Sequence, residues 1–277
     1  MTVMTSRERA GQIVIHGAFA LLFVLVLYPF FMTLSISVKD ELQFIYNRFG
    51  PSFPLWFWTY RRAAVAVIGY LVNTTVNGVI TIVAVLVLSS FTGYIFARLK
   101  FPGKEILFYM IFSLLMIPTI LTLVPQFMIV KGLGLLNTRW VLILPWTAIH
   151  QVLGIFLMRT YLEGLPGDLF ESARIDGCGD FRTYWHIVLP LSKPILATLA
   201  VMKLVDIWND LIWPSVTITD YTKQVLSVGI WALTTEFSGQ YGPMFAGYVF
   251  GSLPLILVFM FGSKYYVEGL LSGALKF

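Results

Sequence analysis

The stretch IVIHGAFALLFVLVLYPFFMTLSI, residues 13–36, contains no Asp, Glu, Lys or Arg. It is long enough for an α-helix that crosses the hydrocarbon core of a bilayer, which needs roughly 20 apolar residues. The same character recurs along the chain. Runs without a charged side chain occupy residues 10–38, 63–97, 106–130, 140–158 and 237–263.

The composition of the whole chain agrees with a lipid environment. Of 277 residues, 12% are charged and 58% are hydrophobic, and the mean hydropathy is +0.81. A soluble domain carries about 25% charged residues, so this chain has too few polar groups to cover its surface in water. The net charge of +5 does not indicate nucleic-acid binding, because no cluster of basic residues interleaved with aromatics occurs.

A sixth apolar stretch, residues 194–216, is interrupted by Lys203, Asp206 and Asp210. With it, the sequence predicts an all-α polytopic membrane protein with six transmembrane helices. The third run contains Pro118 and Pro125, which predict a kinked or interrupted helix. The first run is too long for a signal peptide and has no cleavage site after it, so it predicts a retained helix.

The distribution of basic residues sets the orientation. Eleven Lys and Arg residues lie in predicted inner segments and seven in outer ones, so both termini are predicted to be cytoplasmic. The predicted organisation is an N-terminus over residues 1–11, a single six-helix domain over 12–265 and a C-terminal tail over 266–277. An outer loop over 39–70 precedes the second helix at about 73–97, and the longest inner loop covers 163–191.

Several kinds of site are not expected. Cys178 is the single cysteine, and the three histidines lie in different segments without metal-ligand spacing. No phosphate-binding loop of the G-x-x-x-x-G-K-[ST] type occurs, so no ATP site is predicted on this chain. No nucleophile–base set stands out either, which argues against a membrane-embedded enzyme.

The inner loop contains the charged stretch ESARIDGCGD. Asp168 suits a helix N-cap and Glu171 completes an acidic capping box, while Gly177 suits the C′ position. The helix between them has just over two turns, too few to be stable alone in water. Phe170, Ala173 and Gly177 share one side of this helix, and Ala173 and Gly177 make most of that side small.

A second short helix is predicted to begin at Asp180. Phe181, Tyr184, Trp185 and Val188 are spaced as one amphipathic stripe. Two marginal helices outside the bilayer favour a partner protein that packs on them, although a connector lying on the membrane surface is the alternative.

The loop resembles the signature cytoplasmic loop of permease subunits in binding-protein-dependent ABC importers. That motif reads E-A-A, three residues, G, nine residues and I-x-L-P, and the match departs from it only at Ser172. The residues at the motif positions are Glu171, Ser172, Ala173, Gly177, Ile187, Leu189 and Pro190. The stretches WNDLIWP (208–214) and YYVEGLLSGALK near the C-terminus resemble the second permease subunit of carbohydrate, maltose-type importers.

The resemblance implies a complex in the cell membrane of a bacterium or archaeon. Two different permeases form the path, two cytoplasmic ATPase subunits bind ATP and Mg²⁺, and an extracytoplasmic solute-binding protein delivers the solute. The chain itself is then a non-catalytic subunit without a cofactor.

The resemblance also assigns roles within the loop. Glu171 pairs with a basic group on the ATPase, and Ala173 and Gly177 allow close docking. The I-x-L-P segment anchors the elbow, which is the part of the loop between the short helix and the fifth span, to the membrane helices. The residues assigned to coupling are Glu171, Ser172, Ala173, Asp176, Gly177, Ile187, Leu189 and Pro190.

The charged fifth span has two interpretations. Lys203, Asp206 and Asp210 lie on one helix face, and charges within a span usually face a bundle interior or a water-filled cavity. In the first, they line a path for a hydroxyl-rich solute, with Trp208 or Trp213 against sugar rings. In the second, they clasp the partner permease or lie toward the outer surface. Lys203 and Asp206 are close enough to pair. The candidate path residues are Lys203, Asp206, Trp208, Asn209 and Asp210.

A di- or oligosaccharide is the expected solute. Two alternatives stay open: an ABC permease for a non-sugar solute such as a glycerol phosphate ester, and an ion-coupled secondary transporter.

Overall fold

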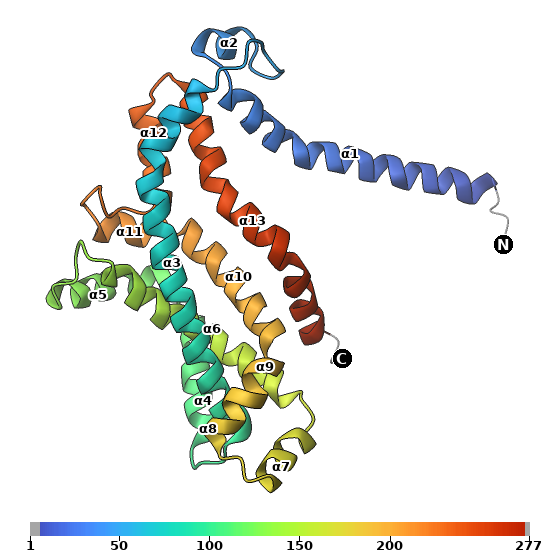
Figure 1. Ribbon diagram of the computed structural model, residues 1–277, viewed down its shortest axis with the longest axis vertical. Coiled ribbons are helices and arrows are strands. Elements are labelled where there is room, and N and C mark those ends of the chain that lie inside the picture. The colour runs from blue at the N-terminus through green and yellow to red at the C-terminus, as the bar shows by residue number, and fades with distance from the viewer. Residues whose placement is uncertain (1–5, 275–277) are drawn as a thin grey trace. The chain divides into compact units, whose positions relative to one another are not determined.

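The computed structural model describes residues 6–274, with the side chains of residues 11–264. Every element in that range is helical (Figure 1). In chain order the elements are α1 (Ser6–Ser37), α2 (Glu41–Tyr46), α3 (Trp58–Arg98), α4 (Lys104–Ser113), the 3₁₀ turn η1 (Leu114–Met116), α5 (Thr119–Gly132), α6 (Trp140–Glu163), α7 (Asp168–Ile175), α8 (Asp180–Thr183), the π-helical turn η2 (Tyr184–Val188), α9 (Leu189–Leu191), α10 (Lys193–Asn209), α11 (Ile212–Thr217), α12 (Leu226–Glu236) and α13 (Tyr241–Ala274).

Four helical segments of the described chain are long and apolar enough to cross a membrane. They are Gly11–Ser37, Trp58–Arg98, Trp140–Glu163 and Tyr241–Lys264. Two bent pairs raise the number to six if each pair is one span: Lys104–Met116 with Thr119–Gly132, and Asp180–Leu191 with Lys193–Asn209. The predicted all-helical fold is confirmed, with four to six helical segments that could cross a membrane.

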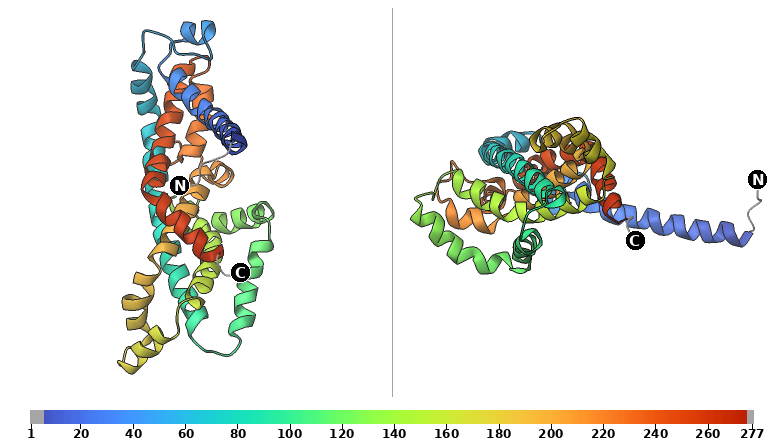
Figure 2. Two further views of the ribbon diagram at one scale, coloured as in Figure 1. Left: turned by 90° about the vertical axis from the view of Figure 1, so that its right-hand side faces the viewer. Right: turned by 90° about the horizontal axis from the view of Figure 1, so that it is seen from below.

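The first bent pair confirms the predicted interruption of the third apolar run. Its two arms meet at 102°, and the bend is plain in the green part of the ribbon in Figure 2. Ile117 is extended, with φ −85° and ψ 115°, because the ring of Pro118 disfavours helical backbone in the residue before it. Pro118 then stands at the N-cap of α5.

The second helix begins earlier than predicted, and the expected outer loop over 39–70 is therefore too long. α3 starts at Trp58 and runs for 41 residues, about twice the length that crosses a bilayer. Arg61 and Arg62 do not end it. The Arg62 guanidinium lies 5.7 Å from the Trp58 ring centroid and 5.4 Å from that of Phe237, so its charge is accommodated on aromatic faces.

The apolar stretch over 194–216, predicted as one span, is not one continuous helix. α10 ends at Asn209, Asp210 has extended backbone, and α11 starts at Ile212. The Asp210 carboxylate accepts the N–H of Trp213 at 3.3 Å, which satisfies a free donor in the first turn of α11. Asp210 thus ends α10 as its C-cap residue and accepts an N–H of α11.

The described chain divides into two compact units. The first comprises residues 6–68 and 230–252. Within it, the buried Lys39 Nζ donates to the carbonyls of Asn47 and Gly50, each at 2.6 Å, and burial lowers the pKa of Lys39. The Phe44 ring stacks on Tyr241 with centroids 4.0 Å apart.

The second unit comprises residues 69–229 and 253–274 and is built around α6, which packs against α4, α10 and α11. α3 and α6 approach closely because of two glycines. A Cβ on Gly154 would lie 2.2 Å from the Ser89 Oγ, and one on Gly93 would lie 2.5 Å from the Met158 Cβ. Small residues at such crossings allow the close contact of backbones that membrane helices use.

Candidate functional site

Both groups of residues singled out in the sequence lie in the second unit. The first group surrounds α7. This helix begins at Asp168, with Gly167 at the N-cap position and no side-chain cap, so the predicted N-cap at Asp168 and its capping box with Glu171 are wrong. Both carboxylates lie in the first turn instead, where they still complement the positive end of the helix dipole.

The end of α7 follows the prediction. Gly177 has a φ of +76°, the left-handed conformation that favours glycine at C′. Its N–H donates to the Arg174 carbonyl at 3.0 Å, and the Cys178 N–H donates to the Ala173 carbonyl at 2.9 Å. This pair of bonds is the Schellman motif.

The side of α7 that carries Phe170 and Ala173 packs on its own chain. Phe170 and Ala173 are 7% and 4% exposed. They face inward, and Phe170 belongs to an apolar cluster with Tyr94, Met158, Leu162, Tyr184, Val188 and Ile195. The outward side carries Glu171, Ser172 and Ile175, and Ile175 is 86% exposed.

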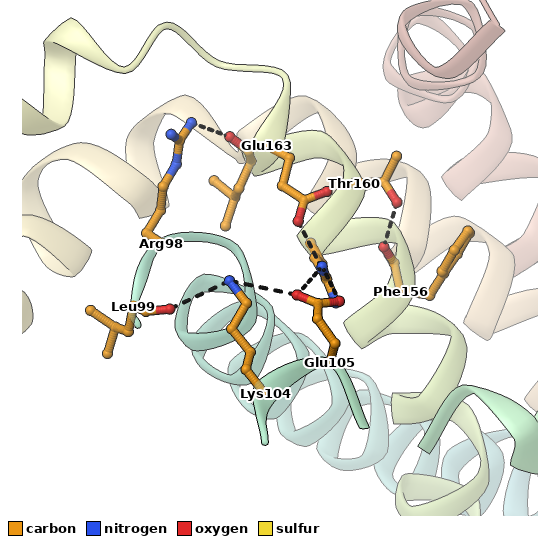
Figure 3. Close-up of polar contacts among 9 residues, drawn as sticks. Arg98, Leu99, Lys104, Glu105, Phe156, Thr160 and Glu163 are labelled. Carbon is orange, nitrogen blue, oxygen red and sulfur yellow. Dashed lines mark hydrogen bonds and ion pairs between the residues drawn. The ribbon is translucent and has the colours of Figure 1, made fainter. Parts of the chain in front are cut away.

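Arg98, the last residue of α3, holds α7 in place. Its Nη2 donates to the carbonyls of Leu162 and Leu165, the latter at 2.8 Å, as Figure 3 shows in part. The guanidinium carbon also lies 4.0 Å from the centroid of the Phe170 ring. One cation therefore joins the ends of α3 and α6 to α7.

Arg159 connects α4 to α6 in the same region, and Figure 3 labels its two carboxylate partners, Glu105 and Glu163. Its Nη2 donates to both Glu105 carboxylate oxygens, at 2.9 and 2.8 Å, and its Nε donates to Glu163 at 2.7 Å. The guanidinium carbon lies 4.0 Å from the Phe108 ring centroid. Planar contacts of this kind suit arginine rather than lysine.

The elbow after α7 differs from the predicted stripe. Tyr184 and Val188 are buried, whereas Phe181 and Trp185 are exposed, so the stripe is divided between two environments where the backbone becomes π-helical. The Tyr184 hydroxyl lies 2.7 Å from the Ser90 Oγ of α3.

The I-x-L-P residues of the elbow are placed in three ways. Leu189 packs against the cluster that contains Phe170. Ile187 is half-buried, and Pro190 is exposed.

The second group borders a cavity of about 430 Å³ between α5, α6, α10 and α11. Its lining residues are Thr119, Ile120, Leu123, Gln126, Pro145, Trp146, Ile149, His150, Val205, Asp206, Asn209, Asp210, Ile212 and Trp213.

The predicted pairing of Lys203 with Asp206 is confirmed. Lys203 is 5% exposed, and its Nζ donates to Asp206 Oδ2 at 2.7 Å. The same oxygen lies 3.8 Å from His150 Nδ1. Lys203 is therefore beneath the cavity wall, and the Asp206 carboxylate faces the cavity.

Asp210 connects two tryptophans of the wall. Its Oδ2 accepts the Trp146 Nε1–H at 2.6 Å and its Oδ1 accepts the backbone N–H of Trp213. The Trp213 Nε1–H in turn donates to the Val141 carbonyl at 2.8 Å. Both indole donors are thus satisfied by the protein, and the rings are held in place.

The structure brings together only part of the predicted path. Asp206, Asn209 and Asp210 line the cavity, whereas Lys203 and the buried Trp208 do not. Sequence reasoning missed Gln126, Trp146 and His150, which come from other helices. The signal nearest to them was the set of prolines in the third and fourth apolar runs, since a broken helix leaves room for a cavity.

Comparison with known proteins agrees with the resemblance seen in the loop. Residues 89–270 match the family described as binding-protein-dependent transport system inner membrane component. The arabinooligosaccharides transport system permease protein AraQ of Bacillus subtilis is 30% identical over 279 residues, covering 93% of each chain. The diacetylchitobiose uptake system permease protein NgcG of Streptomyces coelicolor is 31% identical over 258 residues, covering 92% of this chain and 85% of that one.

The fold has a close counterpart among solved structures. A chain of a bacterial ABC transporter involved in the import of the acidic polysaccharide alginate superposes with a TM-score of 0.85 at 23% identity, covering 96% of this chain and 100% of that chain. The family excludes the ion-coupled secondary transporter as an alternative. The chain belongs to the family of binding-protein-dependent transport system inner membrane components, and it is a non-catalytic, multi-pass permease subunit of an ABC importer in the bacterial inner membrane.

Proposed function

We propose that this chain pairs with a second, different permease to form the path of an oligosaccharide, and that α7 couples this path to cytoplasmic ATPase subunits. The relatives named above are oligosaccharide permeases by description, and the cavity offers tryptophan rings with carboxylate and amide oxygens. Delivery by an extracytoplasmic binding protein, two ATPase subunits carrying ATP and Mg²⁺, and no cofactor on this chain belong to the same proposal.

The proposed topology has six spans with both termini in the cytoplasm. Each bent pair of helices then counts as one span of a single domain over residues 12–265. The excess of basic residues in the inner segments supports this orientation. The proposed cytoplasmic ends, residues 1–11 and 266–277, lie partly outside the described residues.

The coupling proposal rests on one observation: the inner side of α7 packs against the chain, and its outer side is exposed. Phe170 and Ala173 are buried against the chain, while Glu171 and Ile175 are exposed. A helix of eight residues is not stable alone in water, so the inner contacts keep it formed and leave the outer side for a partner.

The burial of the loop residues supports a proposed role for each of them. Glu171, Ser172 and Ile175 form the docking side, whereas the small Ala173 lets α7 sit close to its own bundle. Gly177 and Asp176 shape the turn that ends the helix. In the elbow, Leu189 packs against the Phe170 cluster and the Tyr184 hydroxyl contacts Ser90 of α3, and Ile187 and Pro190 are the further proposed anchors. A push on α7 then moves α3 and α6 through Arg98, which is how closure of the ATPase sites changes access to the cavity.

A charge reversal on the docking side tests this proposal. In the reconstituted importer, Glu171→Lys is expected to lower solute uptake at least tenfold, because a basic ATPase group would then face a like charge. Uptake per ATP hydrolysed is the measurement. Glu41→Lys is the matched control, since Glu41 also lies exposed in the first turn of a short helix. Uptake by Glu171→Lys equal to that of the control would remove the docking role.

A further inference from the structure

The cavity between α5, α6, α10 and α11 has an unbalanced charge. Two of its fourteen lining residues are carboxylates, Asp206 and Asp210, and none is Lys or Arg, all fourteen belonging to the described part of the chain. The nearest cation to Asp206, Lys203, is buried under the wall with its charge directed at that carboxylate.

The two carboxylates are balanced differently. Asp206 forms an ion pair with Lys203 at 2.7 Å. Asp210 accepts neutral donors, the indole N–H of Trp146 and the backbone N–H of Trp213 among them, and makes no ion pair with any residue between 11 and 264. The Asp206 charge is therefore offset by Lys203, and the Asp210 carboxylate is the wall group whose charge has no ion-pair partner between residues 11 and 264.

We propose that this cavity binds an uncharged or cationic saccharide segment and rejects an anionic one, such as a uronate or a phosphate ester. The inference rests on the proposed function and names the solute class within it. It also decides between the two solute alternatives left by the sequence, because a glycerol phosphate ester would bring a second uncompensated negative charge into a site of low polarity.

The wall suits the hydroxyl and C–H groups of a sugar. Carboxylate and amide oxygens of Asp206, Asn209 and Gln126 accept hydrogen bonds from hydroxyl groups. The Trp146 and Trp213 rings are fixed by the bonds that satisfy their N–H groups. They are 3% and 6% exposed and contribute a small apolar part of the cavity wall. The volume of about 430 Å³ falls in the lower part of the range of small-molecule sites, roughly 300–1,000 Å³, which fits a short segment rather than a long chain.

The test measures binding to the intact importer without its binding protein, so that upstream selection plays no part. The purified complex in nanodiscs is dialysed to equilibrium against three trisaccharides: raffinose as the uncharged probe, fully deacetylated chitotriose as the cationic probe, and trigalacturonate as the anionic probe. The tighter of the first two is expected to bind at least tenfold more tightly than trigalacturonate.

Asp210→Asn sharpens the test because the amide oxygen still accepts one of the two N–H groups while the charge is lost. The discrimination against trigalacturonate is expected to fall about tenfold in this variant. Asp220→Asn is the matched control: it removes a carboxylate that lies outside the cavity and is expected to keep the wild-type ratio.

Three results overturn the inference: trigalacturonate binding as tightly as the other probes in the wild type, a ratio unchanged by Asp210→Asn, or binding of none of the three. A different result would contradict the proposed coupling: uptake per ATP that is unchanged by Glu171→Lys. Loss of charge selectivity with normal coupling thus removes only the inference about the solute.

Discussion

The second unit holds two polar clusters that treat their charges in opposite ways. Around α7, the guanidinium groups of Arg98 and Arg159 contact carbonyl oxygens, carboxylates and ring faces of the same chain. At the cavity, Asp206 and Asp210 line the wall, and Asp210 accepts N–H groups of two tryptophans without an ion pair between residues 11 and 264. The first arrangement positions helices, and the second leaves acceptors for a ligand. Within an apolar unit, the presence of charge alone therefore does not distinguish a structural cluster from a binding site.

The largest expected effect comes from breaking the ion pair at the cavity. Asp206→Leu leaves the buried Lys203 ammonium without its carboxylate, which is expected to lower the free energy of unfolding by about 3 kcal/mol. The double variant Lys203→Met with Asp206→Leu removes both charges and is expected to recover most of that loss. Thermal unfolding of the detergent-solubilised chain measures both, and equal losses in the single and double variants would contradict a structural role for the pair.

The Arg98 contacts are expected to be next in size. Arg98→Ala removes two hydrogen bonds to carbonyls and the contact with the Phe170 ring, for an expected loss of about 2 kcal/mol. Arg98→Lys keeps the charge but not the planar fork, so it is expected to be intermediate. A purely structural role would lower stability alone. Because Arg98 also connects α7 to α3 and α6, uptake per ATP is expected to fall as well, in the order wild type, Arg98→Lys, Arg98→Ala.

A smaller effect is expected where α7 ends. Gly177→Leu places a side chain at a φ of +76°, which costs about 1–2 kcal/mol, whereas Gly177→Asn tolerates this conformation better. The strain is local, so hydrogen exchange at the Cys178 amide is expected to accelerate more in the leucine variant. Equal protection in both variants would show that the Schellman turn does not hold the helix.

The smallest effect on stability is expected at Asn209. Its amide Nδ2 donates to the Val205 carbonyl of its own helix, at 2.8 Å, and the side chain lines the cavity. Asn209→Leu is therefore expected to change the thermal midpoint little and to weaken solute uptake several-fold. Wild-type uptake in this variant, together with wild-type uptake in Asp206→Leu, would favour a clasp with the partner permease.

The spans and the loop were predictable because their signals are local. Charge-free runs follow from the thickness of the bilayer, and Gly177 marks a turn that few other residues form. Boundaries were predicted less well. Arg61 and Arg62 looked like loop residues, but aromatic rings of Trp58 and Phe237 accommodate Arg62 within α3.

The cavity could not be predicted from one helix. Asp206 and Asp210 mark a polar face, but Trp146, His150 and Gln126 join them from α6 and α5 only in the folded unit. The inward side of α7 was likewise hidden, since the sequence gives the spacing of Phe170 and Ala173 but not the Arg98 side chain that covers Phe170. Long-range packing decides such faces.

Site-directed cross-linking tests the central claim most directly, that the outer side of α7 contacts an ATPase subunit. In a Cys178→Ser background, Ile175→Cys is expected to cross-link to the ATPase in the assembled importer, and Ala173→Cys, on the buried side, is expected not to. Efficient cross-linking from Ala173→Cys with none from Ile175→Cys would contradict the account.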